Sequence, residues 1–310
     1  MKLIRGLHNL RPEHRGTVAT IGNFDGVHRG HHSIFSRLAD TGRALGMPTT
    51  LITFEPQPLE YFAGANAPAR LTRFKEKLAE LHKTELDRVV VLRFDEQLSN
   101  MEAEQFVTEL LVDRLGVRVL MAGADFRFGR DAYGNLGLLQ SLGARHGFEL
   151  LERETFETAG GRVSSSWIRD ALTNGELELA TELLGRPYAM CGRVQMGQQL
   201  GRTLGYPTAN IAPRRLVSPL SGIYVVSVEG LGADARPGVA SIGTRPTVNG
   251  VGVLLEAHLF DFNEDIYGRE VKVNFLDKLR DEWKFDSLEA MTVQIDKDAG
   301  DARAYFEAQG

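Results

Sequence analysis

One stretch, residues 17–31 (TVATIGNFDGVHRGH), does most to limit what this chain can fold into. Its apolar run stops at Gly22, and apolar residues at helical spacing resume over 34–38, which predicts a strand, a tight turn and a helix. The first N–H groups of a helix lack partners within the helix and favour anions, phosphate above all. Because His28 and His31 fall in this turn, the stretch predicts a phosphate site where the strand ends and the helix begins.

The length and composition of the chain limit its class. Its 310 residues are enough for two domains, and its apolar and charged fractions are those of a soluble globular protein. The formal net charge of −5 argues against a general surface for nucleic acid or anionic membrane. A single cysteine, Cys191, excludes an internal disulfide, and no stretch reaches the roughly 18 apolar residues of a membrane span. We therefore expect a cytoplasmic protein with small-molecule partners and neither nucleic acid nor membrane; a monomer and a weak homo-oligomer both stay open.

The first half of the chain alternates apolar strands with helical segments, which is typical of a parallel α/β sheet. Strands are expected over 17–21, 49–54, 88–94, 117–122 and 148–153, and helices over 32–45, 72–83, 135–146 and from a capping box at 99–102. Two loops follow strands at the edge where parallel sheets bind ligands. Residues 55–58 (EPQP) are expected to form a stiff loop without a helix, or a simple turn. Residues 123–129 (GADFRFG) bracket an Asp and an Arg between glycines, as in a ligand loop or a structural one.

A further candidate lies at residues 164–169 (SSSWIR). Serines are good N-caps, and Arg169 would lie about one turn into the helix that they begin. An N-cap serine alone is usually only a cap. Hydroxyl groups with a guanidinium at a helix N-terminus, however, make a second phosphate site of the same physical type.

The composition changes after residue 185. Strand-like segments follow one another without long helices between them, over 188–194, 222–228, 238–242, 254–260 and 271–276. Such spacing favours a small antiparallel barrel or sandwich, which a helix over 287–296 would close. The sequence thus predicts two domains, 1–185 and 186–310.

The motifs of the first half are, in order, GNFDGVHRGH, FEPQP, LTRFKEKL, GADFRFG and SSSxxR. They resemble the prokaryotic FAD synthetases, whose HxGH signature marks the nucleotidylyltransferase superfamily. In the second half, GRTLGYPTAN over 201–210 resembles the riboflavin kinase signature, and SIGTRPT, EAH and DIYG also match that family. The whole chain is therefore similar to the bifunctional riboflavin kinase/FMN adenylyltransferases. The resemblance implies a Rossmann-like domain with a parallel sheet and helices on both faces, then a small antiparallel β-barrel with a C-terminal helix.

The resemblance implies that the first half transfers AMP from ATP to the phosphate of FMN, which forms FAD and releases pyrophosphate. That nucleophile is already ionised, so catalysis lies in positioning and in stabilising negative charge, with Mg²⁺ bridging phosphate oxygens. The implied catalytic residues are His28, His31 and Arg169. The implied nucleotide-binding residues are Gly22, Asn23, Phe24, Asp25, Gly30, Ser164 and Ser165, and the implied flavin-binding residues are Pro56, Pro58, Asp125 and Arg127.

The second half, by the same resemblance, moves the γ-phosphate of ATP to the 5′-hydroxyl of riboflavin, a neutral nucleophile that benefits from a base. Glu256 matches the catalytic glutamate of the family. Thr208 and Asn210 are two residues apart, so in an extended segment both side chains face one way and offer two oxygen ligands for Mg²⁺. The loop expected to fold over the phosphates contains Gly197, Gly201 and Gly205.

Three residues depart from the family pattern: Gln57, where many relatives carry His, Asp125, where they carry Asn, and Trp167, where they carry a smaller residue. These changes concern affinity or rate and leave the type of reaction as it is. Two other functions stay open. One is a transferase with another acceptor, a cytidylyltransferase or a pantetheine-phosphate adenylyltransferase, which leaves the PTAN half without a role. The other is a non-catalytic flavin-binding or regulatory module.

Overall fold

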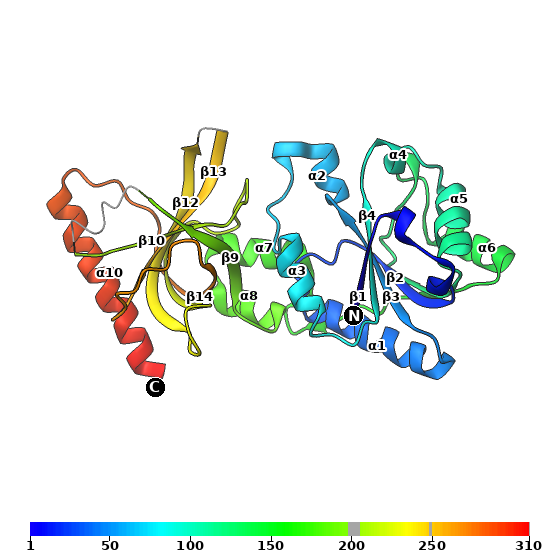
Figure 1. Cartoon of the computed structure of the whole chain (residues 1–310), viewed down its shortest axis with the longest axis horizontal. Helices are drawn as coiled ribbons and strands as arrows, with labels where there is room; N and C mark the ends of the chain where they lie inside the picture. Colours follow the sequence, from blue (N-terminus) through cyan, green and yellow to red (C-terminus); the bar gives the residue numbers. More distant parts are fainter. Residues whose placement is uncertain (198–204, 248–249, 310) are drawn as a thin grey trace. The chain divides into compact units, whose positions relative to one another are not determined.

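The computed structural model describes residues 1–197, 205–247 and 250–309, and the chain forms two compact units (Figure 1). The first unit is Met1–Pro68 with Lys77–Val163, and the second is Ala69–Glu76 with Ser164–Gly310. The predicted fold classes are confirmed, because the first unit holds a parallel sheet with helices and the second a closed antiparallel barrel with a C-terminal helix. Residues 164–185 group with the barrel, so the domain boundary near 185 stays a prediction.

The sheet of the first unit has the strand order β1-β4-β3-β2-β5-β6, with all neighbours parallel. Its strands are β1 (Lys2–Arg5), β2 (Thr17–Ile21), β3 (Thr49–Glu55), β4 (Arg88–Arg93), β5 (Val117–Ala122) and β6 (Glu149–Glu152). The order reverses at β2, because β3 pairs with one of its edges and β5 with the other. Open parallel sheets bind ligands at the carboxyl ends of the strands at such a reversal, so the topology selects the ends of β2 and β5.

Helices cover both faces of this sheet, so β2 is buried over its whole length and β4 over its four middle residues. On one face Ile21, Ile52 and Leu120 pack with Phe106 of η4 and Leu139 of α6, and on the other α1 packs against β2 and β3. The helical elements are η1 (Leu7–Asn9), η2 (Pro12–His14), α1 (Arg29–Leu45), α2 (Pro58–Ala63), η3 (Gly64–Asn66), α3 (Phe74–Leu81), α4 (Glu96–Ser99), α5 (Ala103–Gln105), the π-helix η4 (Phe106–Arg114), η5 (Arg130–Ala132) and α6 (Leu136–His146). A short hairpin of β7 (Glu157–Thr158) and β8 (Gly161–Arg162) completes the unit.

Two predictions of local structure in this unit are wrong. Pro58 begins helix α2 where the prolines predicted a loop without a helix, since the first position of a helix needs no N–H donor. The capping box expected at Ser99 does not form, because Asp95 caps α4 instead and accepts the N–H of Leu98 at 3.1 Å. Ser99 therefore ends that helix, and the next one begins at Ala103.

The barrel of the second unit closes in the order β10-β13-β12-β11-β14-β9, so the barrel alternative is confirmed over the sandwich. Its strands are β9 (Tyr188–Gln195), β10 (Ala209–Ala212), β11 (Gly222–Glu229), β12 (Arg236–Thr247), β13 (Gly250–Leu259) and β14 (Glu270–Arg280), and its helices are α7 (Ser165–Asn174), α8 (Leu177–Leu184) and α10 (Leu288–Gln309). Burial alternates along β9, as expected for a strand with one face toward the barrel interior.

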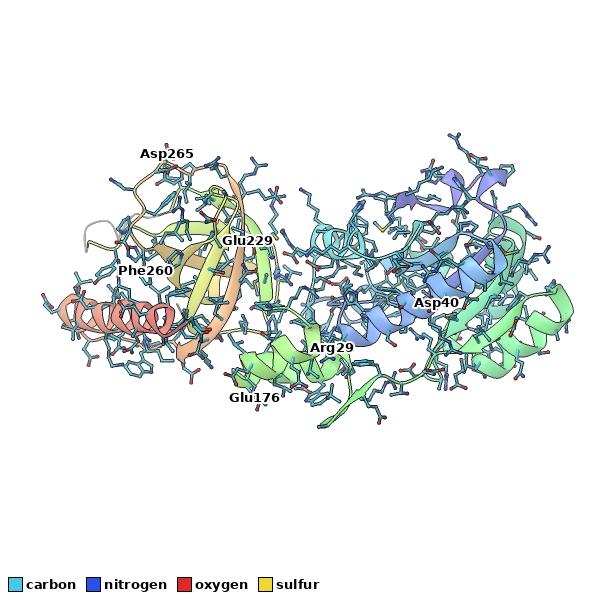
Figure 2. All side chains as sticks on the ribbon, turned by 90° about the horizontal axis from the view of Figure 1, so that it is seen from below. Arg29, Asp40, Glu176, Glu229, Phe260 and Asp265 are labelled. Carbon is cyan, nitrogen blue, oxygen red and sulfur yellow. The ribbon has the colours of Figure 1, made fainter. Side chains whose placement is uncertain are left out.

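Helix α10 is longer than the sequence predicts, because apolar contacts continue beyond residue 296. Ala299 and Ala302 lie in a buried cluster with Val225, Val239 and Phe260 of the barrel. Figure 2 labels Phe260 near this helix, and helix and barrel are in contact through β11, β12 and β14. The helix therefore caps an apolar patch on the outside of the barrel.

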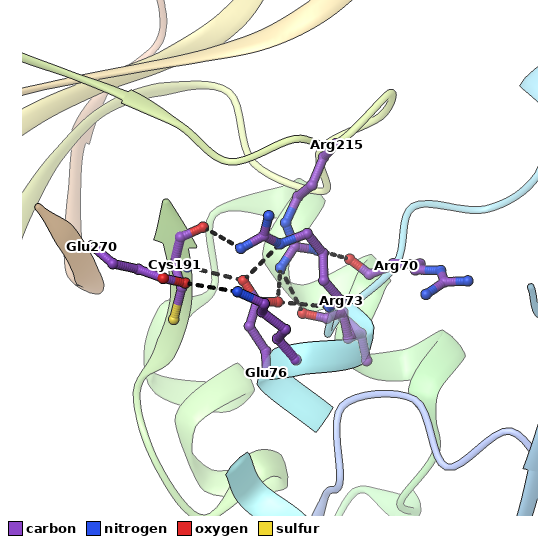
Figure 3. A network of polar contacts seen from close by, with 8 residues as sticks. Arg70, Arg73, Glu76, Cys191, Arg215 and Glu270 are labelled. Atoms are coloured by element: carbon purple, nitrogen blue, oxygen red, sulfur yellow. Dashed lines mark hydrogen bonds and ion pairs between the residues drawn. The ribbon is translucent and has the colours of Figure 1, made fainter. Parts of the chain in front are cut away.

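One buried carboxylate ties residues 69–76 to the barrel (Figure 3). Glu76 Oε2 accepts from Arg215 Nη2 at 2.5 Å and from the backbone N–H of Arg73 at 2.6 Å, and Oε1 accepts from the N–H of Cys191 at 2.9 Å. Arg215 also donates to the carbonyl oxygen of Arg70 at 2.5 Å, and Arg73 to that of Cys191 at 2.7 Å. The side chains of Arg215 and Glu76 are 2% and 7% exposed, so water screens the pair little.

Removing Arg215 should destabilise the second unit more than removing an exposed cation. Arg215→Met keeps the apolar stem and leaves a buried carboxylate without its main counter-charge, so we expect a loss of about 3 kcal/mol in unfolding free energy. Urea unfolding followed by tryptophan fluorescence measures it, because Trp167 and Trp283 both belong to this unit. Lys297→Met, which removes an exposed pair with Asp301, is the control and should leave the midpoint unchanged. A loss below about 1 kcal/mol for Arg215→Met would contradict the assigned role.

Candidate functional site

The loop between β2 and α1, residues 22–28, has an unusual backbone. Phe24 and Val27 adopt positive φ angles of 49° and 45°, and Gly26 between them has 83°. Residues other than glycine adopt this conformation at a cost of about 1–2 kcal/mol each. The side chains of Phe24 and Val27 are buried, and that burial holds the conformation. Strain of this kind at the carboxyl edge of a parallel sheet marks a candidate site.

The two predicted histidines lie together at the N-terminus of α1. His28 is the N-cap residue, and its backbone N–H donates to Nδ1 of His31 at 3.3 Å. The two rings are stacked with centroids 3.5 Å apart. Because Nδ1 of His31 accepts a hydrogen bond, the neutral ring carries its proton on Nε2, where it can donate to a ligand. A Cβ at Gly30 would lie 3.2 Å from the His28 ring, so a larger residue would crowd the imidazoles.

The His31 ring is enclosed by aromatic neighbours. The centroid of Phe24 lies 5.0 Å away and that of Phe35 6.4 Å away. Burial holds the pKa of His31 well below its ordinary value of 6.5, and the nearby charges of His28 and Arg153 lower it further. The ring is therefore neutral at pH 7, and it can donate a hydrogen bond without carrying a charge.

Lys77 is a residue of this site that the sequence analysis missed, although it lies within the quoted LTRFKEKL motif. Its side chain is completely buried, and Nζ donates to the carbonyl oxygen of Asn23 at 2.7 Å. Thr53 Oγ1 of β3 donates to the same oxygen at 3.3 Å. Asn23, one of the predicted nucleotide-binding residues, is thus held by its backbone. Gly22 begins this loop and Asp25 is buried within it.

The predicted flavin-binding residues follow β3 and β5, the strands on either side of β2. Pro56 and Pro58 lie between β3 and α2. Asp125 forms an ion pair with Arg162 at 3.2 Å, a partner that the sequence analysis did not name. Arg127 donates to carbonyl oxygens of its own loop, and the distance to the oxygen of Phe126 is 2.9 Å.

Gln57, one of the three departures from the family pattern, has a buried side chain that is 6% exposed. Its backbone N–H donates to Glu60 Oε2 at 2.9 Å. Its Nε2 makes no hydrogen bond to any residue in the described part of the chain. A buried amide without an acceptor is costly, and the structure gives no compensating contact for it.

The residues of the predicted second phosphate site lie at the start of α7. Ser164 is the N-cap, and its Oγ accepts the N–H of Trp167 at 3.2 Å, while Ser165 is the first helical residue. Arg169 donates through Nε to the carbonyl oxygen of Ala69 at 2.6 Å. These residues belong to the second unit, so their expected position opposite the histidines stays a prediction.

The predicted kinase residues lie on adjacent strands of the barrel. Asn210 of β10 is paired directly with Glu256 of β13 in the antiparallel register. Residues paired in this way point to the same face of a sheet, with Cβ atoms about 5 Å apart. Thr208 precedes Asn210 by two residues and is exposed. A Cβ at Gly197 would lie 2.1 Å from Asn210 Nδ2, so only glycine allows this close approach.

The remaining two glycines of the predicted phosphate loop are Gly201 and Gly205. Gly201 lies outside the described residues. Gly205 has a φ of 83°, a conformation that favours glycine.

The oxygen donors of the barrel fit the requirements of Mg²⁺. Thr208, Asn210 and Glu256 offer hydroxyl, amide and carboxylate oxygens, which are hard ligands of the kind that Mg²⁺ takes together with water and phosphate. In the described parts of the chain no cluster of three or more His, Cys, Asp or Glu side chains could hold a metal by itself. The barrel set therefore suits a metal that arrives with a nucleotide.

The depressed pKa of His31 should make the stability of the protein depend on pH. Below about pH 6.5 the unfolded chain binds a proton at this residue and the folded chain does not, so acid lowers stability. We expect the unfolding free energy to fall as the pH drops below about 6.5, and His31→Gln to reduce this slope by at most about 1.4 kcal/mol per pH unit. Urea titrations at several pH values measure both slopes. Burial lowers the pKa of His14 as well, but His14 contributes equally in both proteins. Identical slopes would contradict the assignment.

Comparison with known proteins gives a consistent family. The model of the FAD synthetase family matches residues 10–167, and that of riboflavin kinase matches residues 184–306. The chain is 48% identical over 307 residues to the bifunctional riboflavin kinase/FMN adenylyltransferase of Escherichia coli strain K12, covering 99% of this chain and 98% of that protein. It is 49% identical over 305 residues to the protein of that name from Pseudomonas fluorescens, covering 98% and 97%.

Among solved structures, the crystal structure of a macrolide-efflux protein from Streptococcus pneumoniae is similar to this chain over 96% of its residues and 97% of the other chain. The TM-score is 0.81 at 29% identity, so the likeness extends through both units. No helix in the described parts of this chain is long and apolar enough to cross a membrane.

The two family models match in the order in which the motifs occur, and the relatives align over nearly the full length of the chain. The chain therefore belongs to the family of bifunctional riboflavin kinase/FMN adenylyltransferases, with its FAD synthetase domain first and its riboflavin kinase domain second.

Proposed function

We propose that this chain converts riboflavin to FMN at the barrel, and FMN to FAD at the strained loop of the first unit. The observation that carries the proposal is the pair of stacked imidazoles at the N-terminus of α1, located at the reversal point of the sheet. The substrates are small molecules: ATP with riboflavin in one step and ATP with FMN in the other. We place the protein in the cytoplasm, either as a monomer or as a weak homo-oligomer.

In adenylyl transfer, an oxygen of the FMN phosphate forms a bond to the α-phosphorus of ATP, and the bond from that phosphorus to pyrophosphate breaks. No proton has to be removed from the nucleophile, so the protein must hold two polyanions together. His31 donates from Nε2 to a phosphate oxygen, His28 lies beside it, and the free N–H groups of α1 add to the positive potential. Gly30 has no side chain to block this approach.

The serines and arginine of α7 would complete the phosphate site. The support for this part of the proposal is local: Ser164 caps α7, and Arg169 lies on the same helix. Ser164, Ser165 and Arg169 would then donate to phosphate oxygens from the second helix N-terminus.

In the kinase step, Glu256 takes the proton of the riboflavin 5′-hydroxyl while that oxygen forms a bond to the γ-phosphorus of ATP, and ADP leaves. The cross-strand pairing with Asn210 supports this role, because it keeps the carboxylate beside a polar ligand group. Thr208 and Asn210 would hold Mg²⁺, which when bound neutralises charge on the phosphates. Gly197 allows the chain to pass close to Asn210.

A flavin assay tests the proposal as a whole. Purified full-length protein is incubated with riboflavin, ATP and Mg²⁺, with or without added FMN, and the flavins are separated by chromatography. Formation of FMN and then FAD is expected. Turnover with CTP or phosphopantetheine in place of the flavin reaction would favour another transferase, and the absence of any product would favour a binding module.

The replacement His31→Ala should affect only the second step. We expect FAD formation from FMN to fall by roughly 10²–10³, the effect of removing one electrostatic stabiliser, while FMN formation is retained. His82→Ala, which removes an exposed imidazole after α3, is the control and should leave both rates unchanged. A parallel loss of both activities in a well-folded His31 variant would show that the two sites are not separate.

The replacement Glu256→Gln should affect only the first step, the formation of FMN. It keeps the size of the side chain but removes the base, so FMN formation should fall by a factor on the order of 10²–10⁴ while FAD formation from added FMN persists. Glu307→Gln on α10 is the control for loss of an exposed carboxylate. Unchanged FMN formation in Glu256→Gln would remove this residue from its proposed role.

A further inference from the structure

Arg153 occupies a place in the first unit that neither the motifs nor the family resemblance singled out. It directly follows β6, and its backbone N–H donates to the carbonyl oxygen of Ala122 at the end of β5, at 2.9 Å. The strands of this sheet are parallel, so Arg153 lies at the same carboxyl edge as the loops 22–28 and 123–129. It is therefore placed at the edge that carries the candidate site.

The guanidinium of Arg153 lies among residues of that site. Its central carbon is 5.9 Å from the ring centroid of Phe24, which is within the range of a cation–π contact. A Cβ at Gly123 would lie 2.5 Å from Nη2 of Arg153, so the glycine leaves the space that the guanidinium occupies. Arg153 also lines a cavity of about 390 Å³ together with Ser33, Met121 and the acidic residues Asp40 and Glu154.

The guanidinium of Arg153 forms no ion pair within the described parts of the protein, although the nearby charge of Asp125 attracts it. The structure gives its guanidinium no carboxylate within 4 Å, and the nearby Asp125 is paired with Arg162 instead. Arg153 is only partly exposed, and its burial lowers the pKa of the guanidinium. Burial of a cation is costly, and the attraction of Asp125 offsets only part of that cost, because the pKa of the guanidinium stays lowered. The same charge contributes to the low pKa of His31, which indicates that its field reaches the imidazole.

We propose that Arg153 is a further substrate-binding residue of adenylyl transfer, donating to a phosphate oxygen of ATP or FMN. The inference rests on the function proposed for this site. A guanidinium stays charged and presents paired donors in one plane, an arrangement that matches a phosphate group. A phosphate would supply a counter-charge in direct contact, which Asp125 does not, and the Phe24 ring would hold the guanidinium in place.

Steady-state kinetics of FAD formation test this role in the full-length chain. ATP is varied at saturating FMN and FMN at saturating ATP, for wild type, Arg153→Met, Arg153→Lys and the control Arg37→Met. Arg37 lines the same cavity, but its guanidinium is paired with Glu154 at 2.8 Å. We expect Arg153→Met to raise KM for one of the substrates by about 10-fold or more, and Arg153→Lys to recover part of the loss. FMN formation from riboflavin should be unchanged in every variant and reports an intact protein.

The two kinetic arms identify the source of the phosphate. A rise in KM confined to ATP assigns Arg153 to the nucleotide, and a rise confined to FMN assigns it to the flavin. The proposal is overturned if both KM values stay within about twofold of wild type, or if Arg37→Met has the same effect. If Arg153→Met misfolds and loses FMN formation, the same criterion is applied to the KM values of Arg153→Lys.

Failure of the proposed function can be distinguished from failure of the assignment of Arg153. If wild-type protein makes no FAD, calorimetric binding of ATP and of FMN to wild type and to Arg153→Met still tests Arg153 by itself. Weaker binding of either ligand to the variant supports the assignment. Equal binding of both ligands rejects it.

Discussion

The buried carboxylate of Glu76 is the contact on which the arrangement of α3 depends. It accepts from Arg215 and from two backbone N–H groups, and it thereby joins residues 69–76 to the barrel. The next residue, Lys77, is buried as well and donates to the carbonyl oxygen of Asn23 in the first unit. Glu76 thus anchors residues of the second unit, and Lys77 anchors a loop of the first. A buried ion pair brings little net stability after desolvation, so its main effect is to select one arrangement of this segment.

The strained loop of the first unit, residues 22–28, depends on the contact that Lys77 makes with Asn23. Phe24 and Val27 would relax out of their positive φ angles if the surrounding structure did not hold them. Lys77 and Thr53 fix the carbonyl oxygen of Asn23, and burial of the Phe24 ring fixes the next residue. The imidazoles at the start of α1 are therefore positioned before any ligand arrives. Such preorganisation reduces the reorganisation that charge stabilisation would otherwise require.

The sequence predicted the elements whose signals are local. Strands β2 and β5 have the predicted bounds, because short apolar runs and a following glycine define them. The sequence could not show that Asp95 would compete with Ser99 for the cap of a helix. Nor could it predict the end of α10, since the contacts of Ala302 with the barrel are distant in the sequence. Local signals cannot weigh one cap against another or anticipate a tertiary surface.

The same limit applies to the candidate sites. The HxGH turn singled out the histidines, and the spacing of Thr208 and Asn210 singled out one side of the candidate kinase site. Lys77 and Arg153 were missed, because a lysine in a helix and an arginine after a strand are ordinary on a surface. Only the structure shows that one is completely buried and that the other lies beside Phe24. Residues that act through a tertiary contact leave no pattern in the sequence.

The difference between the two nucleophiles explains why the two sites carry different charges. A phosphate attacking a phosphate needs no base, and an unpaired carboxylate would repel both reactants. Around His31 the carboxylate of Asp125 is paired with Arg162, and the imidazole itself is neutral. A hydroxyl nucleophile has to lose its proton, and the barrel accordingly presents Glu256 opposite Asn210. Each unit has a buried core of its own, so each can hold its candidate site in a different charge environment.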